Sequence, residues 1–410
     1  MTPAKIKVCV VTSLAAAQEP RAPRHAATLA RMPGVSEVVF VDMAAHGAER
    51  QSVKALEDLP NLTWRTHRFA TRAGNMFQLL WQRVWQRLAR LKFTCGGQVS
   101  PVALSTRVFG LEKVLADAAA DVYLAHNIET LLPAYFVAQQ RGARVMFDSM
   151  EFHSDMGDSQ TPLERRMTAW VERSCLPGCA LVLASSAQVA DALASEYGIA
   201  RPLALDNAAP LELELPSKAA GFHLYWRNAV VGLGHRGLDD ALVALTKLPD
   251  AVTLHLQGRL QFDGGMALRE RISTLGLTKR VVIHPPFSPE NAVQEAAVHH
   301  LGLCLERKGV RNHDLTTSNK IFDYHMAGLS VIASDLLGLR GVIERSGGGL
   351  LFMPGDVEDL TAKILMLYHD ASRLKLLSEA ARAFALREGN REAEMKKFTA
   401  AFVKVCPRKN

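Results

Sequence analysis

Short apolar runs alternate with helix-like segments along almost the whole chain, and this alternation restricts the possible folds most strongly. Runs such as KVCVVTS, EVVFVD and RVMFDS occur in the first half, and TLHLQG, LGLCLE and LSVIAS in the second. They are continuously apolar, as expected for strands of parallel sheets that helices cover on both faces. Strands that alternate with helices build βαβ units. The sequence therefore predicts an α/β protein with doubly wound parallel sheets.

The alternation is interrupted at residues 206–220, DNAAPLELELPSKAA, where two prolines and a polar tail separate two β/α series. A chain of 410 residues is also too long for one ordinary core. We predict Rossmann-like domains over residues 1–208 and 221–388, a linker over 209–220, and a helix within 389–410 that returns to the first domain. Ligands bind such sheets at the carboxyl ends of the strands, so the predicted site is a cleft between two facing domains.

Charge is distributed unevenly along the chain. The net charge is +7, and residues 1–100 alone hold 14 Lys and Arg against 6 Asp and Glu. This excess favours a local anionic partner. No apolar run reaches the roughly 20 residues of a membrane span, and the N-terminus is predicted to be a first strand, not a signal peptide. The six cysteines are scattered, which is typical of a reducing compartment and predicts a cytoplasmic protein.

The clearest amphipathic helix is predicted over residues 76–91, MFQLLWQRVWQRLARL. Trp81 and Trp85 share its apolar face, and Arg83 and Arg87 lie outside that face. Residues 65–92 contain seven Lys or Arg and no acidic residue. These features suit the surface of an anionic membrane, and a helix packed on its own domain is the alternative. Nucleic acid is not an expected partner because no recognised binding module is present.

Polar residues end two predicted strands of the first half. His126 and Asn127 end the run YLAHN, while Asp148, Glu151 and His153 end or follow RVMFDS. Side chains at these strand ends would face the cleft, where they could bind hydroxyl groups or act as a general base. Capping of the following helix is the alternative for the first pair. The His/Asp/Glu spacing matches no trusted metal motif, and the chain has no Asp-x-Asp pair, so we expect no bound metal.

Two segments of the second half have phosphate-binding features. In YWRNAVVGLGHRGLDD, Arg227 lies near a strand end and His235 and Arg236 precede a helix, whose N-terminus can hold phosphate. The glycines of GLGHRG fit the dinucleotide pattern only weakly, because the residue about 20 positions further on, Gln257, is not acidic.

The second segment is TTSNKIFDYHMAGLSVIASD. A helix is expected to begin near Thr317 or Ser318, so that its free amides and Lys320 form a cradle for a diphosphate. Asp323, one turn later, could accept hydrogen bonds from two ribose hydroxyls, and Gly328 would end the helix in a left-handed conformation. A surface helix with an i,i+3 ion pair is the alternative.

Five segments, in this order, resemble motifs of the family-four retaining glycosyltransferases, which have the GT-B fold. They are EPRAPRHAATLAR, DVYLAHNIETLLPAYFVAQQRGARVMFDSMEFHSD, CALVLASSAQVADALASEYGIARPLALDNAAP, HRGLDDALVAL and SNKIFDYHMAGLSVIASD. Each motif is weak alone, but the ordered set is specific and extends along almost the whole chain. The resemblance implies transfer of a sugar from a nucleotide-diphosphate donor with retention of configuration and without bound metal.

The resemblance also implies roles for individual residues. Arg236 and Lys320 match positions that stabilise the diphosphate, Asp323 matches the acid that binds the ribose, and His126 is expected near the donor sugar. The leaving diphosphate would accept the proton of the acceptor, so catalysis would depend on position and charge. The other expected nucleotide-binding residues are Phe287, Arg227, Ser318 and Asn319, and those for donor sugar or acceptor are Asn127, Asp148, Glu151, His153 and Asp314.

Two positions depart from the family pattern, because Leu315 replaces a sugar-contacting Glu and Met150 replaces a His. The leading hypothesis is a transferase that acts on a cell-envelope glycan or lipid-linked acceptor at the inner face of the plasma membrane. The nucleotide sugar is then a substrate, and no cofactor is expected. The alternatives are a nucleotide-sugar epimerase of the same fold and a non-catalytic GT-B subunit that partners an active transferase.

Overall fold

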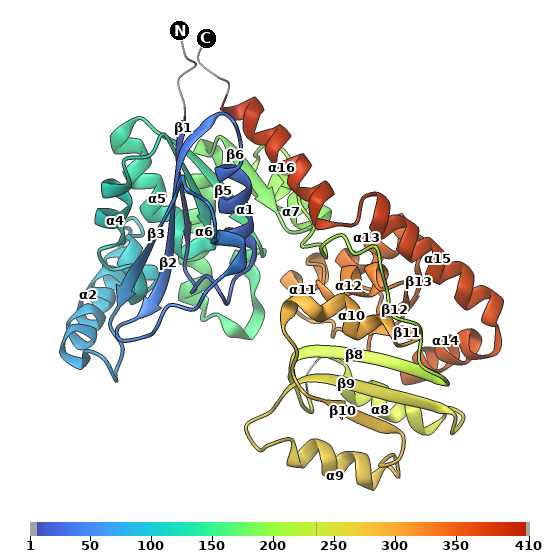
Figure 1. Ribbon diagram of the computed structural model, residues 1–410. Coiled ribbons are helices and arrows are strands. Elements are labelled where there is room, and N and C mark those ends of the chain that lie inside the picture. The colour runs from blue at the N-terminus through green and yellow to red at the C-terminus, as the bar shows by residue number, and fades with distance from the viewer. Residues whose placement is uncertain (1–5, 235, 407–410) are drawn as a thin grey trace. The chain divides into compact units, whose positions relative to one another are not determined.

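The computed structural model describes residues 6–234 and 236–406, and the chain folds into two units (Figure 1). One unit runs through Leu205 and includes the chain again from Met395, and the other is Asp206–Glu394. The predicted linker begins inside the second unit. Hydrogen bonds from Arg382 to the carbonyls of Glu212 and Leu213 tie the linker there, and an Arg345–Asp206 ion pair of 2.8 Å holds the residues just before it.

The first unit is built on a seven-stranded sheet of order β3-β2-β1-β4-β5-β6-β7, in which every pair is parallel. The strands are β1 (Ile6–Thr12), β2 (Val35–Ala45), β3 (Leu62–Phe69), β4 (Val122–His126), β5 (Arg144–Ser149), β6 (Leu181–Ala184) and β7 (Leu203–Ala204). The helices are α1 (Arg21–Ala30), α2 (Met76–Thr94), α3 (Pro101–Leu104), α4 (Leu111–Ala118), α5 (Ile128–Arg141), α6 (Pro162–Cys175) and α7 (Ala187–Tyr197).

The second unit is built on a six-stranded parallel sheet of order β10-β9-β8-β11-β12-β13. The strands are β8 (Phe222–Val231), β9 (Val252–Leu260), β10 (Val281–His284), β11 (Leu301–Cys304), β12 (Ser330–Ser334) and β13 (Gly349–Phe352). The helices are α8 (Leu238–Thr246), α9 (Met266–Thr274), α10 (Ala292–Ala297), α11 (Arg311–Leu315), α12 (Lys320–Met326), α13 (Leu337–Ser346), α14 (Val357–His369) and α15 (Ala371–Arg387).

Helices cover both faces of the second sheet, with α8 and α9 on one side and α10 and α12 on the other (Figure 1). Neighbouring residues of β8 therefore enter different cores: Trp226 packs in the cluster on one face and Tyr225 in the cluster on the other. This two-sided burial explains why the strands are continuously apolar. The predicted α/β class with doubly wound parallel sheets is confirmed.

The last helix, α16 (Arg391–Val405), crosses from the second unit into the first. Phe398 and Phe402 on this helix are buried in the core cluster that contains Val8 and Leu124 of β1 and β4. The chain from Met395 thus supplies core side chains to the first unit. Among the described residues, every helix is too short or too polar to span a membrane.

Candidate functional site

Three basic side chains and two carboxylates gather near the carboxyl ends of β8 and β11 and the start of α12. Lys320 begins α12, and its side chain is only 5% exposed. Its Nζ lies 3.7 Å from Oε1 of Glu306 and 5.5 Å from the centre of the Trp226 ring, and it makes no hydrogen bond within the described residues. Burial lowers the pKa of Lys320, Arg236 and Arg227 lower it further, and Glu306 opposes the change.

Glu306 follows β11 and joins two of these cations. Its Oε1 accepts a hydrogen bond of 2.6 Å from Nη1 of Arg236, and its backbone N–H donates to Oγ of Ser334 at 2.8 Å. Arg236 has a φ of +43°, a left-handed conformation that is unfavourable for a side chain with a Cβ. Such strained residues often lie at functional sites. His235, which precedes it, lies outside the described residues.

Arg227 and Asp323 form a second ion pair beside this group. One Nη of Arg227 contacts a carboxylate oxygen of Asp323, and the backbone N–H of Arg227 donates to the Tyr324 hydroxyl at 3.1 Å. The guanidinium also lies 5.7 Å from the centre of the Phe287 ring. The structure thus brings together Arg227, Arg236, Asp323, Lys320 and Phe287, all of which the sequence predicts to lie in one site.

These side chains form a small electropositive site, because three cations face two carboxylates. Positive groups that are preorganised and partly desolvated suit an anionic ligand such as a diphosphate. Sequence reasoning missed Glu306, although it directly follows the apolar run LGLCL at a strand end. The strand-end rule that selected His126 and Asp148 would also have selected it.

The start of α12 differs from the expected one. The helix begins at Lys320 after Asn319, and the Asn319 side chain makes no capping hydrogen bond. The predicted caps at Thr317 and Ser318 are therefore wrong, and one reason is that the Thr317 hydroxyl donates instead to the carbonyl of Gly338 at 3.2 Å. Gly328 does follow the helix in a left-handed conformation, with a φ of +69°.

Asp314 does not join the cations at the start of α12. Its Oδ1 accepts a hydrogen bond of 3.1 Å from the backbone N–H of Leu337, the first residue of α13. Leu315, at the position of the family Glu, is buried. The structure therefore gives Asp314 a capping contact rather than a place beside Lys320.

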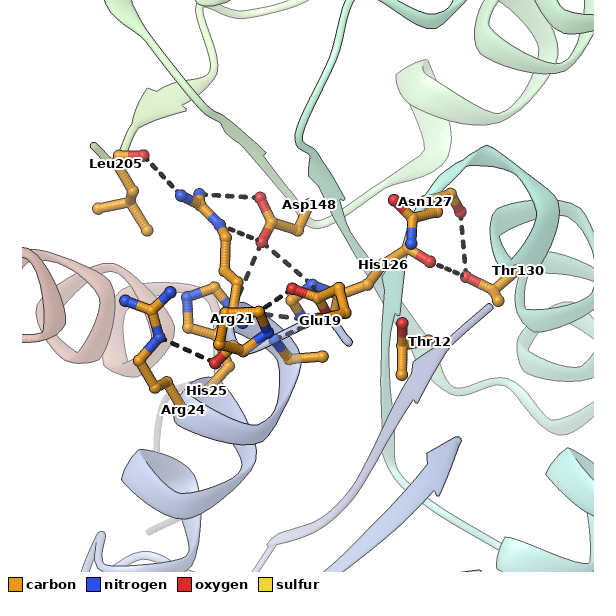
Figure 2. A network of polar contacts seen from close by, with 12 residues as sticks. Thr12, Glu19, Arg21, Arg24, His25, His126, Asn127, Thr130, Asp148 and Leu205 are labelled. Atoms are coloured by element: carbon orange, nitrogen blue, oxygen red, sulfur yellow. Dashed lines mark hydrogen bonds and ion pairs between the residues drawn. The ribbon is translucent and has the colours of Figure 1, made fainter. Parts of the chain in front are cut away.

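The first unit contains a separate buried polar network around Asp148, which Figure 2 shows. Arg21 of α1 donates from Nε and Nη2 to the two Asp148 oxygens at 2.6 and 2.9 Å. His126 Nδ1 lies 3.2 Å from Oδ2 of Asp148, and His25 Nδ1 lies 3.4 Å from Nε2 of His126. Glu19 lies 3.9 Å from His126. All five side chains are buried.

This burial determines the charges in the network. Burial alone would raise the pKa of Asp148, but the guanidinium of Arg21 outweighs it and holds the pKa well below its usual value. Burial also lowers the pKa values of His126 and His25, so both imidazoles are neutral at pH 7. Asp148 is therefore a charged partner of Arg21, and both Asp148 and His126 are buried.

The other polar residues of these strand ends are also held in place by the fold. His153 is buried, and this burial lowers its pKa to about 4. Asn127 has a φ of +68° directly before α5, which marks a sharp turn at the strand end. The carbonyl of Glu151 accepts a hydrogen bond of 2.9 Å from the Ser149 hydroxyl. His153, Asn127 and the Glu151 carbonyl thus have three different local roles at these strand ends.

The amphipathic helix α2 turns its predicted apolar face to solvent. Phe77, Trp81 and Trp85 are 83%, 51% and 47% exposed. The helix is held instead by three buried side chains on its opposite side, Leu79, Gln82 and Phe93. The packed-helix alternative is therefore wrong for this face, although α2 itself does pack on the unit. Arg83 and Arg87 are also exposed.

Both parts of the chain match known glycosyltransferase families. A family model described as Glycosyl transferase 4-like domain matches residues 46–205, and one described as Glycosyl transferases group 1 matches residues 230–370. A search of curated protein sequences returns no significant match.

Solved structures share the whole architecture at low sequence identity. Sucrose-phosphate synthase from Thermosynechococcus elongatus has a TM-score of 0.74 at 14% identity, over 98% of this chain and 99% of that chain. A glycosyltransferase from Rickettsia africae has a TM-score of 0.71 at 14% identity, over 99% and 100%. HepE of Anabaena in complex with UDP and glucose has a TM-score of 0.69 at 15% identity, over 97% and 100%.

Two Rossmann-like units with parallel sheets of seven and six strands define the GT-B class of glycosyltransferase. The two family matches identify the family within this class, because together they cover most of the chain and follow the order of the two units. The chain belongs to the group 1 glycosyltransferases, with a family-four-like N-terminal domain, and is an enzyme that transfers sugars.

Proposed function

We propose that the protein transfers a sugar from a nucleoside diphosphate to a cell-envelope glycan or lipid-linked acceptor, with retention and without a metal ion. The observation that carries this proposal is the group formed by Lys320, Arg236 and Glu306. Lys320 is buried without a hydrogen bond from its ammonium group within the described residues, which is costly unless a ligand supplies an acceptor. The oxygens of a diphosphate would supply it.

The proposed reaction uses this charge arrangement to stabilise the leaving group. When the bond between the anomeric carbon and the phosphate oxygen breaks, negative charge develops on the leaving diphosphate. Lys320 and Arg236 stabilise that charge from fixed positions, the role that a divalent cation has in other transferases. The acceptor hydroxyl attacks from the face that the diphosphate leaves and gives its proton to the diphosphate, so the configuration is retained and no protein base is needed.

Asp323 and Arg227 would position the nucleoside. The Asp323 carboxylate can accept hydrogen bonds from both ribose hydroxyls once Arg227 moves toward the phosphates. Phe287, in the loop after β10, lies beside Arg227 and would contact the base. Because HepE of Anabaena is described in complex with UDP and with UDP-glucose, we propose a uridine nucleotide first.

A cavity of about 280 Å³ in the first unit is the proposed acceptor site. It lies at the ends of β1, β2 and β3 and is lined by Arg50, Arg68 and Arg107, among other residues. Nε of Arg107 is buried without a hydrogen bond among the described residues. The three guanidinium groups outnumber the two carboxylates that also line the cavity, Asp42 and Glu49, and favour an anionic acceptor, such as a phosphorylated lipid or an acidic glycan.

The exposed face of α2 would hold the enzyme at the surface of an anionic membrane. Phe109 follows Arg107 of the acceptor cavity, and its ring centre lies 5.1 Å from that of Trp81. Aromatic and aliphatic side chains would enter the headgroup region while Arg83 and Arg87 contact lipid phosphates. In vesicle flotation, binding should require anionic lipid, fall with salt, and fall after the double substitution Trp81→Ser and Trp85→Ser. Unchanged flotation of the double variant contradicts this placement.

A thermal-shift panel of uridine, guanosine and adenosine diphosphates tests the donor proposal. A ligand that binds only the folded state raises the unfolding temperature, so one of the three should stabilise the protein without added metal and in the presence of a chelator. Failure of all three contradicts nucleotide-sugar chemistry and favours a non-catalytic subunit. Turnover of a nucleotide sugar to an isomer without any acceptor points to the epimerase instead.

A further inference from the structure

Five histidines lie close together in the second unit, on the face of the sheet that α10 covers in part. They come from different elements: His223 from β8, His255 from β9, His284 from the end of β10, and His299 and His300 from the turn before β11. They line or adjoin a cavity of about 500 Å³ that also reaches Gln257 and Glu295. None of the residues placed above in the diphosphate group lines this cavity.

Three of these imidazoles could share one metal ion. Each of His255, His284 and His299 has a potential ligand atom, and these three atoms all lie within 4.8 Å of one another. Nδ1 of His255 is 2.9 Å from Nε2 of His284. Zinc–nitrogen bonds of about 2.0–2.1 Å in a tetrahedron place ligand nitrogens about 3.3 Å apart, so small ring movements suffice.

The second nitrogen of two of these rings is already oriented. Nε2 of His255 lies 3.1 Å from the Thr253 hydroxyl, and Nδ1 of His299 lies 3.2 Å from the Ala296 carbonyl. Metal-binding histidines usually make such a contact with the ring nitrogen that does not bind the metal. The ion would then be held by Nε2 of His299, by Nδ1 of His255 and by Nε2 of His284, and it would replace the present contact between the last two atoms.

The neighbouring His223 and His300 are held differently. Nδ1 of His223 lies 2.6 Å from the Thr253 hydroxyl, and its Nε2 lies 2.7 Å from the Ala220 carbonyl, so both of its nitrogens are engaged. Nδ1 of His300 accepts from the His223 backbone N–H at 3.2 Å. The candidate ligand set therefore consists of three histidines and not five.

The protonation state also suits a metal site. Burial, followed by the nearby imidazoles, lowers the pKa of His255 to about 3, and burial lowers that of His299 to about 4. Burial lowers the pKa of His284 as well. Neutral imidazole is the form that binds metals, and the site itself rests on the spacing of the three ring nitrogens.

We propose that His255, His284 and His299 bind one divalent transition-metal ion of the zinc class. Three imidazoles with an open fourth position, next to the Glu295 carboxylate or a water molecule, are a typical zinc arrangement. The ion would link β9, the edge strand β10 and the turn before β11. This role is structural and separate from sugar transfer, so it does not depend on the proposed function.

A second group of possible ligands, His25 with His126 and Asp148, is not suited to bind a metal ion. Its carboxylate is already bound by two nitrogens of Arg21, and a cation there would be repelled by that guanidinium. The cavity beside the β10 edge has no such basic side chain among its lining residues.

Binding of Zn²⁺ to the full-length protein without an affinity tag tests the site. The protein is first treated with a chelator, dialysed, and titrated with Zn²⁺, with bound metal measured by elemental analysis. We expect one equivalent of Zn²⁺ and a higher unfolding temperature. The substitutions His284→Gln and His299→Gln should each weaken binding at least about tenfold, and the exposed-residue control His369→Gln should not.

The visible absorption of bound Co²⁺ separates loss of the metal site from loss of folding. Co²⁺ in a three-histidine tetrahedral site should give strong visible absorption in wild type and in His369→Gln, and this absorption should be lost in His284→Gln. Circular dichroism of the metal-free variants should match wild type. No bound Zn²⁺ at about 100 μM, or equal Zn²⁺ binding by wild type and a folded His284→Gln, overturns the proposal and leaves hydrogen bonding as the role of these histidines.

Discussion

Replacing Lys320 by Met should separate nucleotide binding from folding. The lowered pKa of Lys320 means that its charged form is less favourable in the folded chain than in the unfolded chain, so the ionised ammonium group destabilises the ligand-free protein at pH 7. Methionine has a similar length and can fill the same space beside Trp226 without that penalty. Glu306 keeps its 2.6 Å contact with Arg236, so no carboxylate is left unpaired.

The substitution Lys320→Met should weaken nucleotide binding without weakening the folded state. The free energy of unfolding of Lys320→Met should stay within about 1 kcal/mol of wild type or rise, because removal of a poorly compensated buried charge is often neutral or stabilising. Nucleoside diphosphate binding should weaken by about 1.5–3 kcal/mol, the usual contribution of a hydrogen bond to a charged group. This loss corresponds to a roughly 10- to 150-fold increase in Kd.

Urea unfolding without ligand and calorimetric titration with the stabilising nucleotide measure these two quantities. Lys247→Met is the matched control, because Lys247 pairs with Glu358 on the exposed surface of the same unit and should change neither. A Lys320→Met protein that loses several kcal/mol of stability but binds the nucleotide normally refutes the reasoning. That outcome would assign Lys320 to the core and not to the donor site.

Two further predictions concern buried ionisable side chains. Asp148→Asn should lower the free energy of unfolding by about 3–5 kcal/mol, because it removes the carboxylate that neutralises the buried Arg21. Urea unfolding measures this loss, and a loss below about 1 kcal/mol contradicts a charged pair. His325 is buried, and burial lowers its pKa to about 3 although a backbone contact with Gly348 opposes the change. The unfolded chain takes up the proton first, so this histidine removes about 1.4 kcal/mol of stability per pH unit as the pH falls below about 6.5. His325→Leu should therefore flatten the dependence of unfolding free energy on pH between 7 and 5 by about 2 kcal/mol, whereas parallel curves for variant and wild type refute it.

The fold was predictable because its signals are local. Strands buried on both faces are continuously apolar, and 206–220 has the prolines and polar residues of a break between units. The nearness of Lys320 and Asp323 was predictable for the same reason, since both lie within one short helix that begins after a polar turn. Their spacing along the chain is enough to place them near each other.

The partners of these residues were not predictable from spacing. Glu306 and Arg227 reach α12 from two other strands, and only the order of the sheet brings them there. The burial of Asp148 has the same origin, because Arg21 comes from α1, 127 positions away in the sequence. Strand-end polarity therefore identifies candidate residues, but tertiary packing decides which of them meet a ligand and which neutralise each other.

The helix α2 shows a different limit of prediction from sequence. Its pattern correctly identifies an apolar stripe with basic neighbours, but an apolar stripe usually packs inward. Here the smaller set of Leu79, Gln82 and Phe93 holds the helix, and the stripe with Trp81 and Trp85 remains exposed. Only the positions of the surrounding elements decide which face is covered.

One turnover experiment can detect sugar transfer from a nucleotide donor and show whether the configuration is retained. The protein, in the presence of a chelator, is mixed with nucleotide sugars and with phosphorylated lipid or glycan acceptors on anionic vesicles. Nucleotide release is followed by chromatography and the new linkage by NMR. We expect release of a nucleoside diphosphate together with a glycosylated acceptor whose anomeric configuration matches that of the donor. An inverted linkage, or turnover that requires a metal ion, contradicts it.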